Sequence, residues 1–126
     1  MKLQCKIFEH DKLSWGQRLI VSMFRENTPL DVRFIRKRKK FLIIRFTGRD
    51  CDFYAAVLVG EFASVIDHMW LAGNKEPRPV GGGLPMRTPD DSRALWYWYP
   101  VLRDLLRAFN GWPGYPWGPV REILCN

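Results

Sequence analysis

The chain has 126 residues, of which 47% are hydrophobic and 14% aromatic, which is enough for one domain with its own core. This composition excludes a wholly disordered chain, and polar residues interrupt every long apolar stretch, which argues against a membrane span. The net charge of +7 favours acidic or polyanionic partners. We therefore expect a single basic domain covering residues 1–126.

The first predicted elements are a strand and a helix. Residues 2–8 alternate between apolar and polar side chains, which predicts a half-buried strand. Ser14 followed by Gln17 fits a capping box, so a helix near 15–26 is predicted next. The same apolar residues also suit a strand at 18–24, which stays open as the alternative.

A β-hairpin is predicted after this helix. Strands are expected near 31–35 and 41–47, and the second has apolar residues on both faces, as a central strand does. The polar run 36–40 between them would form the exposed tip of the hairpin.

The positive charge is concentrated in this hairpin. Between Val32 and Arg49 there are eight basic residues and no acid, whereas the rest of the chain has 12 basic and 13 acidic residues. Such a patch attracts the phosphate backbone of a nucleic acid or an acidic protein surface. The predicted polyanion site consists of the eight basic side chains Arg33, Arg36, Lys37, Arg38, Lys39, Lys40, Arg45 and Arg49.

Two further helices are predicted in the second half. Asp50 or Asp52 can begin a helix near 51–72 with a broad apolar face. A Gly- and Pro-rich loop follows at 75–88, and then a helix near 89–109, in which Pro100 should introduce a kink or a restart. The resulting fold class is α+β, a small antiparallel sheet packed by helices.

The loop contains a candidate anion site. Gly82 and Gly83 are followed by Arg87 and Thr88 at the expected start of a helix, where free backbone N–H groups bind anions. The spacing does not match a P-loop or a dinucleotide-binding motif. A flexible hinge is the alternative interpretation.

The C-terminal residues 111–126 are predicted to form an extended aromatic tail that wraps over the domain. Residues 120–125 are a further strand candidate. Trp112, Tyr115 and Trp117 are candidate contacts to a protein partner, because exposed aromatic side chains dominate interface energetics.

No catalytic or metal-binding constellation is recognised. The chain has two histidines and three cysteines without metal-ligand or disulfide spacing. Cys51 and His68 would lie far apart on one predicted helix, and Asp67 and His68 would be a solvated pair on its surface. We therefore expect no metal, no cofactor and no enzymatic activity.

The sequence favours a non-enzymatic structural or assembly module that binds a polyanion, RNA first, and a neighbouring protein within a homo- or hetero-oligomeric complex. Two alternatives stay open. One is a small effector or inhibitor, of the kind found in phage or toxin systems, that docks on an acidic protein. The other is a nucleotide- or phosphate-binding protein that uses residues 81–88. The lack of paired cysteines and of an N-terminal apolar run indicates an intracellular, reducing compartment.

Overall fold

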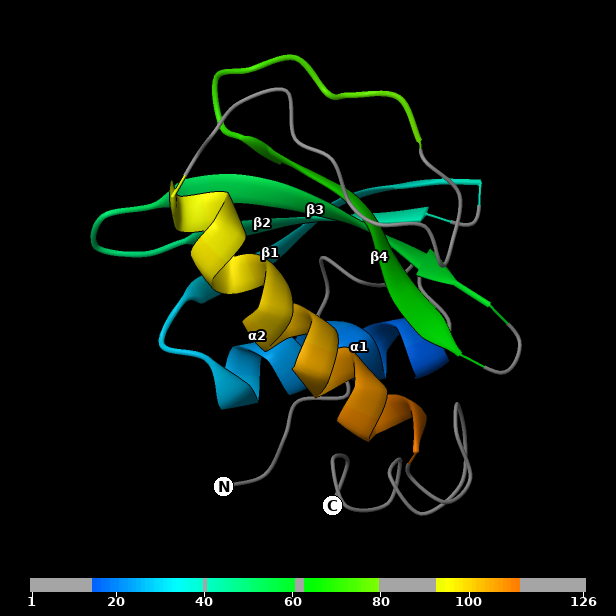
Figure 1. The fold of residues 1–126 in the computed structure, drawn as a ribbon. Helices are drawn as coiled ribbons and strands as arrows, with labels where there is room; N and C mark the ends of the chain where they lie inside the picture. Colours follow the sequence, from blue (N-terminus) through cyan, green and yellow to red (C-terminus); the bar gives the residue numbers. More distant parts are fainter. Residues whose placement is uncertain (1–14, 40, 61–62, 80–92, 112–126) are drawn as a thin grey trace.

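The fold is α+β, a four-stranded antiparallel sheet packed by two helices, as the sequence predicts (Figure 1). The computed structural model describes residues 15–39, 41–60, 63–79 and 93–111. The elements in chain order are α1 (Trp15–Asn27), β1 (Asp31–Arg38), β2 (Phe41–Thr47), β3 (Asp52–Val59), β4 (Ser64–Leu71) and α2 (Arg93–Asn110).

The four strands form a meander in the order β1-β2-β3-β4, in which every neighbouring pair is antiparallel. The structure confirms the strands predicted near 31–35 and 41–47. It also confirms that the second of them lies in the interior of the sheet. The hairpin tip is shorter than predicted, because β1 continues through Arg38 and pairs with β2 down to Phe41. Lys39 lies in the turn with φ at 56°, a conformation uncommon for a residue with a side chain. Lys40 lies outside the described residues.

The predicted helix near 51–72 is wrong, since this segment forms the β3–β4 hairpin. Strands buried on both faces carry nearly continuous apolar residues, and such a run also satisfies helical spacing. Gly60 marks the break between the strands: its N–H donates to the Ala63 carbonyl at 2.9 Å. A Cβ at this position would lie 2.8 Å from the same oxygen, so a larger residue would force the turn apart.

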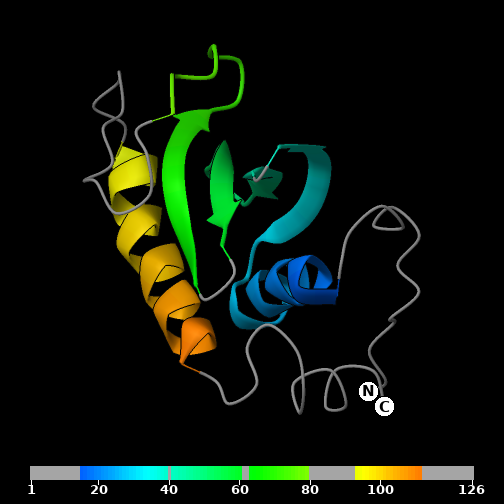
Figure 2. The ribbon, with the colours of Figure 1, turned by 90° about the vertical axis from the view of Figure 1, so that its right-hand side faces the viewer.

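Both helices pack on one face of the sheet (Figures 1 and 2). The helix predicted near 15–26 is confirmed, and α1 buries Phe24 edge-on against Phe46 of β2, with ring centroids 5.3 Å apart. Phe46 in turn stacks on Phe53 of β3 at 5.2 Å. This aromatic row joins the first helix to the two interior strands.

Helix α2 confirms the described part of the helix predicted near 89–109, but it does not restart at Pro100. A proline inside a helix costs about 3 kcal/mol, because it lacks an N–H and crowds the preceding turn. Here α2 buries Leu95 before the proline and Leu102, Leu106 and Phe109 after it in the same core. Since one buried leucine stabilises a fold by about 2–5 kcal/mol, this packing outweighs the local cost.

Several predictions fall on residues outside the described ranges. These are the strands at 2–8 and 120–125, the aromatic tail with Trp112, Tyr115 and Trp117, and the anion site of Gly82, Gly83, Arg87 and Thr88. Within the described ranges, no helix combines the length and the apolar character that crossing a membrane requires.

Candidate functional site

The face of the sheet opposite the helices carries an ordered row of side chains. The strand register places Arg36 of β1, Ile43 of β2, Ala56 of β3 and His68 of β4 opposite one another across all four strands. Arg36 and His68 are thus on opposite edge strands, with Ile43 and Ala56 between them. Neighbouring strands are about 4.8 Å apart, so about 14 Å separates the two edge strands, and a further side chain is needed to connect them.

Asp67 and His68 form a buried pair on β4. A β-bulge there opposes Val57 to Ile66 and Ala56 to His68, which leaves Asp67 as the extra residue. Its Oδ2 lies 2.7 Å from Nδ1 of His68, and both side chains are 0% exposed. The prediction of a solvated pair on a helix surface is therefore wrong. Adjacent residues point in different directions on a regular strand, but a bulge lets their side chains meet.

Glu76 connects this pair to the basic hairpin. In Figure 1 the segment after β4 crosses the top of the view towards the turn between β1 and β2. Oε2 of Glu76 lies 2.8 Å from Nε2 of His68. Arg36 donates from Nη2 to Oε1 at 3.1 Å, and Arg38 donates from Nη2 to Oε2 at 2.5 Å. One carboxylate thus joins two arginines of β1 to the histidine of β4.

Positively charged neighbours stabilise the ionised form of Glu76. Burial alone would raise the pKa of Glu76, but hydrogen bonds from His68 and Arg38 and the positive charge of both groups lower it below its ordinary value. Both ring nitrogens of His68 face carboxylate oxygens, Nδ1 that of Asp67 and Nε2 that of Glu76, so the ring is held between the two acids.

An aromatic stack holds the His68 ring in place. Trp70 stacks on it with ring centroids 5.4 Å apart, and Phe41 contacts it edge-on at 5.9 Å. Tyr54 continues the stack beyond Trp70 at 5.1 Å, and the Arg45 guanidinium lies 5.5 Å from the centre of the Tyr54 ring. Trp70 is only 4% exposed, so this stack supports the histidine and is not a surface for incoming bases.

Seven of the eight predicted basic residues are described, and they fall into two groups, of which the first is ion-paired. Besides Arg36 and Arg38, Arg33 pairs with Asp31 at 2.9 Å on the exposed start of β1. Arg45 donates to both carboxylate oxygens of Asp52, at 2.8 and 2.5 Å. The bonds from Arg45 lower the pKa of Asp52, against the effect of its partial burial. The sequence interval 32–49 contains no acid, but the fold brings acids from outside it.

The second group is exposed and has no ion-pair partner within the described residues. It consists of Lys37 on β1, Lys39 in the turn and Arg49 in the β2–β3 connection. The eighth residue, Lys40, is not described. The prediction that residues 36–40 form the tip of the hairpin is therefore wrong for Arg36 and Arg38, which lie on β1 and belong to the Glu76 network.

Sequence reasoning missed Glu76 as a functional residue and misjudged Asp67 and His68. The three residues meet only through the fold, and their meeting depends on the register of four strands. One signal is present in the sequence: Glu76 is the only acid between Asp67 and Asp90, in a chain whose basic hairpin contains no acid of its own. An isolated acid in such a chain indicates a partner among the basic side chains.

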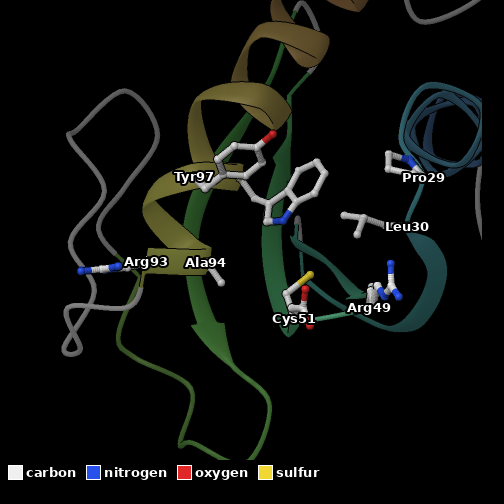
Figure 3. Close-up of a pocket in the computed structure, with 10 residues that line it drawn as sticks. Pro29, Leu30, Arg49, Cys51, Arg93, Ala94 and Tyr97 are labelled. Atoms are coloured by element: carbon white, nitrogen blue, oxygen red, sulfur yellow. The ribbon is translucent and has the colours of Figure 1, made fainter.

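A separate cavity of about 460 Å³ lies between the start of α2 and the β2–β3 connection (Figure 3). Its wall includes Leu30, Cys51, Tyr97 and Trp98. Arg93 also borders the cavity, but its side chain points away from Cys51 and Leu30. The polar groups therefore do not converge on one position, and the cavity offers less defined chemistry than the Glu76 network.

Cys51 and His68 lie on opposite faces of the sheet, since Cys51 packs on the helix side and His68 stacks on the other. In the described part of the chain, no three His, Cys, Asp or Glu residues are grouped so that they could hold a metal ion. Comparisons of the chain with protein-family models, with curated proteins and with solved structures found no match.

Proposed function

We propose that this domain is a non-enzymatic module that binds a polyanion, RNA first, along strand β1 and the β1–β2 turn. The observation that carries the proposal is a row of exposed cations on one edge strand. Arg33, Arg36 and Arg38 have side chains that are 69%, 51% and 46% exposed, and Lys37 and Lys39 are exposed beside them. A polyanion that contacts this row gains from the release of its condensed counterions.

The edge position of β1 makes the row accessible. Among the described strands, only β2 pairs with β1. At the start of β1, Arg25 donates from Nε and Nη2 to the Val32 carbonyl, at 3.2 and 2.8 Å, which covers that part of the edge. Beyond Val32 the edge carries basic side chains, which also discourage pairing with another strand.

The proposal includes a neighbouring protein in an assembly. Trp96 and Tyr97 on α2 are 51% and 64% exposed, and exposed aromatic residues of this size are typical anchors of protein interfaces. They lie on the helix side of the molecule, so one domain could contact a polyanion and a protein at different surfaces. We place this assembly in a reducing, intracellular compartment, because the three cysteines lack the spacing of a disulfide framework.

An acidic protein that docks on β1 is the second candidate partner. The same edge strand favours it, because an extended acidic segment could align its carboxylates with the cations of β1. The two candidate partners differ in their response to nuclease. A nucleic acid binds through phosphates and is removed by nuclease, whereas a protein partner survives that treatment.

Fluorescence anisotropy with a labelled single-stranded uridine oligomer tests the proposal. With about five cations engaged, the affinity should fall roughly 100-fold between about 50 and about 200 mM salt. Polyglutamate should compete poorly at equal charge if RNA is the partner class. Failure of the oligomer to bind at low salt, with tight binding of polyglutamate, would instead assign the surface to an acidic protein.

A further inference from the structure

We propose that the carboxylate of Glu76 occupies a binding site for a phosphate group between Arg36 and Arg38, and that a phosphate of the bound polyanion displaces it. The inference rests on the proposed polyanion binding and specifies where the first phosphate is held. Glu76 would then act as a resident competitor that sets the affinity of the surface.

The two arginines are arranged as a clamp for one anion. Arg36 and Arg38 are two residues apart on β1 and therefore lie on the same face of the strand, where both converge on the Glu76 carboxylate. Within the described residues, each guanidinium uses only Nη2 for this contact, and about half of each side chain is exposed. The guanidinium fork matches carboxylate and phosphate equally well in geometry, so a phosphate can take the same place.

His68 adds a third donor to the site. Its Nε2 faces Glu76, while Nδ1 is held by the buried Asp67. When Glu76 leaves, Nε2 still faces the position that the Glu76 oxygen occupied, so an incoming phosphate oxygen can lie within hydrogen-bond distance of it. A phosphate group has several acceptor oxygens, so it can serve Arg36, Arg38 and His68 together.

Glu76 lies on a segment that few backbone hydrogen bonds hold in place among the described residues. In the described part of the chain, backbone hydrogen bonds tie the segment after β4 only at its beginning: Ala72 donates to the Asp52 carbonyl and Asn74 to the Leu71 carbonyl. Residues 75–79 have no regular secondary structure, and the side-chain contacts of Glu76 hold them to the sheet. Exchanging these contacts for phosphate contacts breaks no strand or helix.

The test compares Glu76→Gln with wild type and with Asp104→Asn, which makes the same change in net charge on the exposed side of α2, away from the hairpin. The ligands are the uridine oligomer and inorganic pyrophosphate. The readouts are affinity and the imidazole NMR signals of His68. The chain has only two histidines, so a His10→Gln background leaves a single imidazole to follow.

We expect Glu76→Gln to tighten oligomer binding about two- to fivefold, the equivalent of one competing surface ion pair, whereas Asp104→Asn has little effect. In a protein with an intact Glu76, the His68 signals should shift on binding of either ligand. This NMR readout does not depend on how well the Gln variant folds.

Two results would overturn the inference. Weaker or unchanged oligomer binding by Glu76→Gln would show that Glu76 positions the arginines instead of competing for them. Binding that leaves the His68 signals unmoved would show that the phosphate lies elsewhere. If pyrophosphate shifts His68 but the oligomer does not bind at all, the phosphate site stands and the proposed polyanion function fails.

Discussion

Replacing Arg38 by Gln should destabilise the domain, although Arg38 looks like one of several dispensable surface charges. Its partner Glu76 has a side chain only 14% exposed, whereas Arg38 is 46% exposed. Exposed ion pairs contribute under about 1 kcal/mol, and breaking a fully buried pair costs about 3–5 kcal/mol. Arg36 and His68 remain beside the carboxylate, so we expect an intermediate loss of about 1–2 kcal/mol.

Lys37→Gln is the matched control for this variant. It removes the same charge from the preceding residue of β1, where no ion-pair partner is present among the described residues. Its effect on the free energy of unfolding should stay within about 0.5 kcal/mol. Urea unfolding with a shared m-value measures both variants.

A double-mutant cycle tests the physical reason for the difference. In the double variant Arg38→Gln and Glu76→Gln, the carboxylate that Arg38 neutralises is gone as well. The double variant should therefore recover part of the stability that Arg38→Gln loses, with a coupling free energy of about 1 kcal/mol. Equal stability of Arg38→Gln and Lys37→Gln, or a coupling near zero, would refute the reasoning that Glu76 depends on Arg38.

Three further predictions concern stability. The pKa of Glu76 is lowered from its ordinary value of 4.5, so its contribution to the free energy of unfolding is complete above about pH 4.5 and is lost as the pH falls through the lower, folded-state pKa. Acid unfolding curves of wild type and Glu76→Gln should therefore converge at low pH, and a constant gap between them would contradict this. Phe46→Ala removes a fully buried ring that touches two others and should cost about 3–5 kcal/mol in urea unfolding, and a cost below about 1 kcal/mol would be incompatible with this core. Asn110 ties the end of α2 to the start of β4, accepting from the Ser64 N–H at 2.8 Å and donating to the Ser64 carbonyl at 2.9 Å. Asn110→Ala should cost about 1–3 kcal/mol and speed amide exchange at Ser64, and unchanged exchange there would argue against the link.

The α+β class and the first hairpin follow from local patterns. Alternation in β1, the doubly apolar β2 and the amphipathic α1 each depend on neighbours within one element, so the sequence carries the information directly. The β3–β4 hairpin does not follow in this way. Its apolar residues fill both faces of the strands, which removes the period of two. The signals that favour strands over a helix are Gly60 and the β-branched residues Val57, Val59, Val65 and Ile66.

The candidate site was predictable as a region but not as an arrangement. Charge counting finds the hairpin, because exposed cations close in sequence stay close in space. It cannot find that Arg36 and Arg38 share Glu76, since that contact joins residues 40 and 38 positions apart. Nor can it find the Asp67–His68 pair, which depends on a bulge that appears only when β4 is paired with β3.

The central claim is that β1 and its turn hold the polyanion. The most direct test measures how RNA affinity depends on salt in a variant that leaves the ion-pair network intact. Lys37→Gln with Lys39→Gln removes two exposed cations of the β1 strand and turn that have no ion-pair partner in the described residues. Arg93→Gln with Arg107→Gln removes two exposed cations from α2 and serves as the control.

The account predicts that the hairpin variant binds the uridine oligomer more weakly and that the slope of log affinity against log salt becomes shallower by about 1.4 units, whereas the α2 variant keeps the wild-type slope. Equal slopes for wild type and the hairpin variant, or an equal loss in both variants, would contradict the claim that β1 and its turn hold the polyanion.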